Sequence, residues 1–281
     1  MNAHTMPFRS IERSDPAIPM QGLEFLTVKS NALRQRADVA LFVPPEVRAV
    51  ADLPIVMLLH GVHGSHWAWG LKGAAHVTTA RLIDEGTLPP VALLMPSDGL
   101  WGDGCGYVAH AAQDFERWIV DEVPALAVAT VAGCTAHSPL LVAGLSMGGF
   151  GALRLAGKHP RRFAAAAAHS TITDIAQFDA LVEEARDDWS NVPADRSVLA
   201  ALTGATAPLP PLRFDCGRGD PLLAANRTLH EALDKASIAH RYAECSGGHD
   251  WAYWSSALED TLHFFGEVLR GDITGPGKEN A

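Results

Sequence analysis

The sequence lacks the features that mark secreted, membrane-embedded or nucleic-acid-binding proteins. It has four cysteines in 281 residues, and no two of them have the Cys-x-x-Cys spacing of a metal or redox motif. No apolar run is long enough to span a membrane, and residues 1–19 have no apolar core of the kind found in secretory signals. The formal net charge of −10 would repel the phosphates of a nucleic acid. We therefore expect a cytoplasmic protein with reduced thiols and with neither a nucleic-acid nor a membrane partner.

The chain alternates between strand-like apolar runs and segments with helical periodicity. The runs 22–30 and 36–43 are expected to pair antiparallel at a sheet edge. Further strand-like runs lie at 54–59, 91–95, 140–145, 163–168, 212–216 and 240–244. Helical segments are expected at 74–86, 115–126, 147–156, 221–236 and 250–269. This alternation predicts an α/β fold with a mostly parallel central sheet and helices on both faces.

The length fits a single domain, which we place at residues 21–270. Residues 1–20 are polar and interrupted by proline, which predicts an irregular arm, and residues 271–281 are expected to form a flexible tail. Residues 171–211 lack strand patterns and are expected to form a small cap over the active site. Ligands of such sheets bind beyond the carboxyl ends of the strands.

One stretch, residues 140–153, combines a buried strand, a sharp turn and a helix. The turn reads Gly-Leu-Ser-Met-Gly at 144–148 and matches the nucleophile elbow, in which a serine is held exposed on a strained strand-to-helix bend. Glycines two residues to either side let neighbouring backbone pass close by. A glycine-rich turn with a capping serine would have the same sequence pattern, but the flanking strand and helix favour Ser146 as a nucleophile.

A serine hydroxyl needs a base that removes its proton, and after such an elbow the acid and the histidine follow in the chain. We predict His249 as the base because it lies in the loop 246–250, between the last expected strand and the last expected helix. His230 and His263 fall inside expected helices, where packing or surface roles are favoured.

The acid that orients the base is expected in the loop after the preceding strand. Asp220 follows the flexible turn 216–219 and is our prediction. Asp215, inside the expected strand, is the alternative, and Asp174 is a third candidate. Asp250 adjoins the base and is expected to cap the final helix.

Two backbone amides are needed to stabilise the negative charge that forms on an attacked carbonyl oxygen. One is expected from Met147, which directly follows the nucleophile. The other is expected from Val62, in the loop after the strand 54–59.

Histidines and tryptophans near these loops raise two further questions. His60, His63 and His66 could chelate zinc if they were helical, but they lie on a glycine-containing loop without a carboxylate cluster. We expect loop packing there, with no metal and no cofactor.

Trp101 and Trp189 lie on expected active-site loops and are predicted to line the acyl or alcohol pocket.

Four separated motifs follow one another along the chain: His-Gly at 60–61, Gly-Leu-Ser-Met-Gly-Gly-Phe-Gly-Ala-Leu at 144–153, Cys-Gly-Arg-Gly-Asp at 216–220 and Gly-Gly-His-Asp-Trp-Ala-Tyr-Trp at 247–254. Together they resemble the esterase D family of α/β-hydrolases, over nearly the whole chain. The resemblance implies the α/β-hydrolase fold, the triad Ser146, Asp220 and His249, and an oxyanion hole formed by the Val62 and Met147 amides.

That family includes S-formylglutathione hydrolases, short-chain acyl esterases and mycobacterial mycolyltransferases. Where the larger S-formylglutathione hydrolases carry a Ser-Gly-Leu-Thr-Cys-Thr type of loop, this chain has residues 60–65, so it is most similar to the smaller bacterial esterases. The resemblance implies a serine carboxylesterase that acts on acyl esters or thioesters, and the short insertion 171–211 favours short acyl chains. The alternatives are an acyltransferase, an S-formylglutathione hydrolase and a non-catalytic binding module, the last disfavoured by the complete triad.

Overall fold

The computed structural model describes residues 8–44 and 50–273. Its strands are β1 (Ile11–Arg13), β2 (Leu23–Lys29), β3 (Arg36–Phe42), β4 (Ile55–Leu59), β5 (Ala92–Pro96), β6 (Leu140–Leu145), β7 (Ala165–His169), β8 (Leu212–Gly217) and β9 (Arg241–Cys245). Its helices are α1 (Ala68–Leu71), α2 (Ala75–Asp84), α3 (Phe115–Arg117), the π-helix η2 (Trp118–Glu122), α4 (Val123–Thr130), α5 (Met147–Lys158), the 3₁₀-helix η3 (Ile175–Ala180), α6 (Pro193–Arg196), α7 (Val198–Thr203), α8 (Leu223–Lys235) and α9 (Trp251–Arg270).

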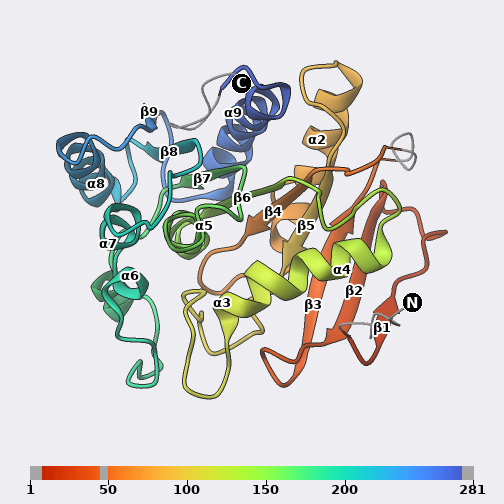
Figure 1. The fold of residues 1–281 in the computed structure, drawn as a ribbon, viewed down its shortest axis with the longest axis horizontal. Coiled ribbons are helices and arrows are strands. Elements are labelled where there is room, and N and C mark those ends of the chain that lie inside the picture. The colour runs from red at the N-terminus through yellow and green to blue at the C-terminus, as the bar shows by residue number, and fades with distance from the viewer. Residues whose placement is uncertain (1–7, 45–49, 274–281) are drawn as a thin grey trace.

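The strands of the described residues form one sheet in the order β1-β2-β3-β5-β4-β6-β7-β8-β9 (Figure 1). From β5 to β9 all neighbours in this order are parallel, whereas β2 is antiparallel to both β1 and β3, and β3 is antiparallel to β5. The predicted mostly parallel α/β sheet and the antiparallel pairing of β2 with β3 are therefore confirmed.

The prediction of an irregular arm is wrong for residues 11–13, which form the edge strand β1 paired with β2. This strand has three residues, too few for a period-2 pattern to be visible in the sequence. The guanidinium of Arg13 forms an ion pair with Glu24 of the neighbouring strand. Residues 1–7 of the expected arm and 274–281 of the expected tail lie outside the described residues.

Each face of the sheet has its own apolar core, because successive strand residues point to opposite faces. In β4, Ile55, Met57 and Leu59 pack with the core that contains Trp118 of η2 and Phe150 of α5. The alternate residues of β4 pack with the core that contains α2 and α9. Figure 1 shows these two helix layers on either side of the sheet. No helix in the described part of the chain has both the length and the apolarity needed to cross a membrane.

The insertion 171–211 folds into η3, α6 and α7 and packs against α5 (Figure 1). The approach is close, since a Cβ on Gly157 of α5 would lie 2.6 Å from the carbonyl carbon of Ala201 of α7. Val198 and Leu202 of α7 are buried in the same core as α5. The insertion is therefore anchored on the helix that follows Ser146.

A buried ion-pair cluster ties α3, α5 and α6 together. The fully buried guanidinium of Arg154 lies 2.7 Å from Glu116 Oε2 and 2.7 Å from Asp195 Oδ1. Lys158 Nζ lies 2.8 Å from the same Glu116 oxygen, and His159 Nε2 is 2.7 Å from the other one. Burial by itself would raise the pKa of the Glu116 carboxyl, but the hydrogen bond to His159 and the charge of Arg154 hold it well below its usual range.

Glu116→Gln is expected to lower the free energy of unfolding at neutral pH by roughly 1.5–3 kcal/mol, as for a lost hydrogen bond to charged groups. Because the pKa is lower in the folded state, Glu116 stabilises the fold above the usual Glu value of ~4.3 and loses that effect as the pH falls below it. The difference between wild type and variant should therefore shrink between about pH 5 and about pH 3. Urea unfolding at each pH measures it, and a difference that stays constant over this range would contradict the assignment.

Candidate active site

Ser146 lies between the end of β6 and the start of α5, with φ 53° and ψ −115°. A non-glycine residue at such a φ is strained, and this strain is typical of functional positions. A Cβ on Gly144 would lie 2.2 Å from the carbonyl carbon of Gly148, and a Cβ on Gly148 would lie 2.2 Å from Leu59 O. No side chain fits at either position, so the predicted close approach of neighbouring backbone is confirmed.

His249 reaches Ser146 from the loop between β9 and α9. Its Nε2 lies 3.1 Å from Ser146 Oγ, and its Nδ1 lies 2.9 Å from Asp220 Oδ2. Because an ionised carboxylate only accepts hydrogen bonds, Nδ1 carries the ring proton and Nε2 is left to accept the serine hydroxyl. Trp254 packs its ring at 85° to the imidazole, with the centroids 4.9 Å apart. The three side chains thus form one continuous hydrogen-bond chain.

Asp220 is brought to His249 by a close contact between two glycine turns. A Cβ on Gly217 would lie 2.6 Å from Gly247 O, and the Gly219 N–H donates to that oxygen at 2.8 Å. The second carboxylate oxygen of Asp220 accepts the Leu222 N–H at 2.8 Å. Burial would raise the pKa of this carboxyl, but the hydrogen bonds that the carboxylate accepts, led by the one from His249, together lower the pKa below its ordinary value. Asp220 is therefore ionised at neutral pH.

The other acidic candidates are bound elsewhere. Asp215 is fully buried, with both oxygens 3.0 Å from His169 Nδ1, and it accepts the Tyr253 hydroxyl at 2.5 Å. Asp174 caps η3 by accepting the Ala176 N–H, and Asp250 caps α9 as predicted, by accepting the Tyr253 N–H. Of the acidic side chains in the described part of the chain, only Asp220 forms a hydrogen bond with the His249 ring.

The loop 60–64 lies against the serine. A Cβ on Gly61 would be 3.3 Å from the Ser146 Cβ, and one on Gly104 would meet both Met147 Sδ at 2.5 Å and Val62 Cγ1 at 3.3 Å. Met147 is the first residue of α5, so its N–H has no acceptor within the helix. Among the described residues the Val62 N–H has no backbone acceptor either.

His60 fixes the conformation of that loop, in agreement with the loop packing expected from the sequence. Its Nε2 accepts the Asp98 N–H at 3.1 Å, which leaves the Nδ1 proton to be donated to Gly61 O at 2.7 Å. The Tyr107 hydroxyl donates to the His60 carbonyl at 3.1 Å. His63 and His66 face other partners, Asp103 at 3.3 Å and the Ser65 hydroxyl at 2.9 Å.

The cavity beside Ser146 and His249 has a volume of about 270 Å³. Its apolar wall includes three tryptophans: Trp67, Trp251 and Trp254. Lys72 lies at its edge, with its ammonium 5.8 Å from the Trp67 ring centroid. The sequence left open whether Trp67 and Trp251 lie in the core or line a pocket. Trp251 and Trp254 belong to the motif 247–254 and begin the helix after His249, and Trp67 follows the Val62 loop.

The prediction that Trp101 and Trp189 line this cavity is wrong, because neither is among its described lining residues. Trp189 is only 2% exposed and stacks on His110, with the centroids 4.8 Å apart and the planes at 20°. Trp101 packs edge-on against both rings. Burial of these large apolar surfaces against each other places both tryptophans in the contact between the insertion, which contains Trp189, and the loop that contains Trp101.

The insertion also does not cover the cavity, since none of the described residues lining it comes from 171–211. It contacts the loop 99–106 instead: the Glu183 N–H donates to Asp103 Oδ2 and the Asp103 N–H donates to Glu184 Oε2, both at 3.0 Å. The insertion that was expected to cap the active site thus packs against α5 and against this loop.

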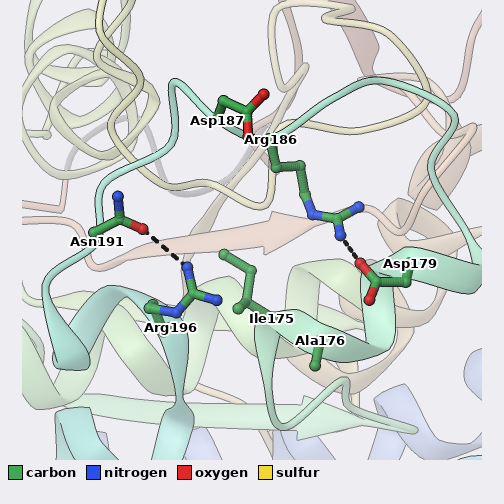
Figure 2. A pocket seen from close by; sticks show the side chains of 7 residues that line it. All are labelled: Ile175, Ala176, Asp179, Arg186, Asp187, Asn191 and Arg196. Atoms are coloured by element: carbon green, nitrogen blue, oxygen red, sulfur yellow. Dashed lines mark hydrogen bonds and ion pairs between the residues drawn. The ribbon is translucent and has the colours of Figure 1, made fainter.

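A second cavity, of about 330 Å³, lies within the insertion itself (Figure 2). Its two arginines are already engaged, Arg186 with Asp179 and Arg196 with Asn191. With Asp187 at its rim, the charges of the lining residues balance. Its described lining residues include no serine, cysteine or histidine, so the candidate active site is the cavity beside Ser146.

Solved structures with the same fold are esterases and related hydrolases. A ferulic acid esterase superposes with a TM-score of 0.76 at 22% identity, covering 92% of this chain and 100% of the other. An S-formylglutathione hydrolase from Agrobacterium tumefaciens superposes with a TM-score of 0.75 at 20% identity, covering 94% and 100%. At these identities the likeness shows the fold, which is that of an α/β-hydrolase.

The class of protein follows from the fold together with sequence relatives: this is a carboxylester hydrolase. An acetyl esterase from Caldicellulosiruptor saccharolyticus is 24% identical over 236 residues, which is 77% of this chain and 85% of the relative. The chain belongs to the family described as "Putative esterase", whose model matches residues 30–265.

Proposed function

We propose that this chain is a serine carboxylesterase that hydrolyses short-chain acyl esters or thioesters through Ser146, His249 and Asp220. The observation that carries the proposal is the hydrogen-bond chain from Asp220 through His249 to Ser146, with distances of 2.9 and 3.1 Å. Membership in the esterase family and the relation to an acetyl esterase support it.

In the first half of the reaction, His249 Nε2 takes the proton of the Ser146 hydroxyl while Oγ attacks the carbonyl carbon of the ester. The oxygen that becomes negative is stabilised by the amides of Val62 and Met147. The imidazolium, held by the Asp220 carboxylate, then protonates the leaving alcohol or thiol. An acyl group remains on Ser146, and no cofactor takes part.

In the second half, His249 removes a proton from water, and the hydroxide attacks the acyl carbonyl. The same two amides stabilise the second oxyanion. Ser146 leaves as its Oγ regains the proton from the imidazolium, and the carboxylic acid is released.

A labelling experiment tests the proposal directly. A fluorophosphonate probe should attach to Ser146, as mapped by mass spectrometry of a digest, and should abolish hydrolysis of p-nitrophenyl acetate in proportion to labelling. Labelling of another residue, or full activity after complete labelling of Ser146, would contradict it. S-formylglutathione and an added alcohol acceptor, assayed in parallel, distinguish the thioesterase and acyltransferase alternatives.

Short acyl chains are expected to be the best substrates because the cavity of about 270 Å³ lies just below the range of ~300–1,000 Å³ typical of ligand pockets. In a series of p-nitrophenyl esters, kcat/KM should be highest from acetyl to butyryl and should fall for longer chains. Trp67→Ala removes part of the cavity wall and should shift the preference towards longer chains, whereas Trp101→Ala should leave it unchanged. A kcat/KM that climbs steadily from acetyl to palmitoyl would contradict this expectation.

A further inference from the structure

Helix α8 leads into the edge strand β9 at one end of the sheet (Figure 1). Three side chains that are able to ligate metal meet at this connection. His230 and Asp234 are four residues apart on α8 and therefore share one face of the helix. His240 immediately precedes β9. One potential ligand atom from each of the three lies within 4.8 Å of the others. None of the three lines the cavity beside Ser146.

Both imidazoles are held in place by aromatic stacking. The side chain of His240 is 2% exposed and stacks on Phe214, with the ring centroids 5.5 Å apart and the planes at 20°. His230 stacks on Tyr242, with the centroids 4.6 Å apart and the planes at 26°. Rings fixed in this way lose little freedom when their nitrogens bind a ligand.

With both imidazoles neutral, the three groups bring together more hydrogen-bond acceptors than they have protons to donate. His240 Nδ1 donates to Ile238 O at 2.7 Å, so its Nε2 is an acceptor. A neutral His230 donates its one ring proton from Nδ1 to His240 Nε2, over 2.8 Å. The His230 Nε2 is then an acceptor, and it lies 3.6 Å from another acceptor, Asp234 Oδ2. The other Asp234 oxygen lies 3.9 Å from His240 Nε2.

We propose that His230, Asp234 and His240 bind a divalent transition-metal ion, with Zn²⁺ as the best match. Two imidazole nitrogens and one carboxylate are ligands that Zn²⁺ prefers. Ligand atoms ~2.0–2.1 Å from a tetrahedral ion lie ~3.3 Å apart, and the observed 2.8 and 3.9 Å lie on either side of that spacing. The Ile238 carbonyl holds the His240 ring in the way that such acceptors commonly orient metal-binding histidines.

The site is accessible, because the Asp234 side chain is 62% exposed, and water can complete the coordination. The ion would join the last turn of α8 to the edge strand β9. It would therefore act on stability, separately from the chemistry at Ser146. This assignment does not depend on the proposed esterase mechanism.

The test is calorimetric titration of the EDTA-treated, dialysed full-length protein with ZnCl₂, together with thermal unfolding with and without Zn²⁺. The wild type should bind one ion per chain and unfold at a higher temperature when Zn²⁺ is present. Asp234→Asn removes an exposed carboxylate without affecting packing and should weaken zinc binding by at least ~10- to 100-fold, as should His240→Gln. His263→Gln is the matched control, because His263 and Glu259 form a similar i,i+4 pair on α9 at 3.9 Å, with no third ligand among the residues that the structure describes.

Three results would overturn the proposal: no saturable binding by the wild type at micromolar Zn²⁺, undiminished binding by Asp234→Asn, or an equal loss in His263→Gln. If His240→Gln does not fold, Asp234→Asn alone decides the question. Hydrolysis of p-nitrophenyl acetate by Asp234→Asn should equal that of the wild type, which separates this site from the active site.

Discussion

Ser146→Ala is expected to reduce the turnover of p-nitrophenyl acetate by at least ~10³-fold while leaving the protein folded. The substitution removes the atom that is proposed to accept the acyl group, the Oγ that lies 3.1 Å from His249 Nε2. Alanine keeps the Cβ that the strained φ of 53° already accommodates, so the backbone gains no new strain. Residual hydrolysis should come from the two amides and from substrate binding.

Ser97→Ala is the matched control for this substitution. Ser97 is also buried directly after a strand of the sheet, and its hydroxyl accepts the Gly99 N–H at 3.0 Å without reaching His249. Turnover of this variant should stay within a few-fold of wild type, and circular dichroism and urea unfolding should confirm that both variants are folded. Near-normal turnover by a folded Ser146→Ala would show that the nucleophile lies elsewhere.

The elements around Ser146 could be predicted because their signals are local. Gly144 and Gly148 are required by backbone contacts of 2.2 Å, and no other residue type could satisfy them. The order of serine, acid and histidine limited the search for partners, and the glycines beside Asp220 and His249 identified loops able to bend towards each other. These features depend on a few neighbouring residues, which a single sequence contains in full.

The tryptophans of the cavity could not be predicted in the same way. Whether Trp101 or Trp67 lines a pocket depends on how loops from different strands pack, and their sequence contexts are alike. Trp251 and Trp254 begin α9, and their helical spacing indicated only a buried face. Trp189 was misplaced because the insertion packs against the loop 99–106, a contact between segments about eighty residues apart.

The segment 115–126, expected as one helix, contains the π-helix η2, and a proline in the sequence accounts for the irregularity. Pro124 has no N–H, so it cannot donate to Val120 O one turn earlier. The chain forms the π-helix η2 just before it, and Arg162 Nε donates to the Val120 carbonyl at 3.3 Å instead. A proline within an expected helix therefore indicated the irregularity, although not its type.

Asp220 and Asp215 differ in their surroundings in a way that predicts opposite phenotypes. In the proposed mechanism Asp220 orients the base, since its Oδ2 accepts the His249 Nδ1 proton at 2.9 Å. Asp215 neutralises the Arg213 guanidinium, and it also lies against His169 and accepts the Tyr253 hydroxyl. Burial would raise the pKa of the Asp215 carboxyl, but His169 and Arg213 lower it, as expected for an ionised group that stabilises the folded state.

Asp220→Asn is therefore expected to lower kcat by up to ~10⁴-fold with little loss of stability, because an amide leaves the imidazole in the wrong tautomer and its cation unstabilised. Asp215→Asn should instead lower the free energy of unfolding by about 3–5 kcal/mol, the cost of leaving buried charges without their partner, while the folded fraction keeps most of its kcat. Saturating p-nitrophenyl acetate, active-site titration with a fluorophosphonate and urea unfolding of both variants separate the two effects. The titration is needed because it counts only folded, competent sites, so that a loss of stability is not mistaken for a loss of chemistry. A folded Asp215→Asn without activity beside an active Asp220→Asn would reverse the assignment and make Asp215 the partner of the catalytic base.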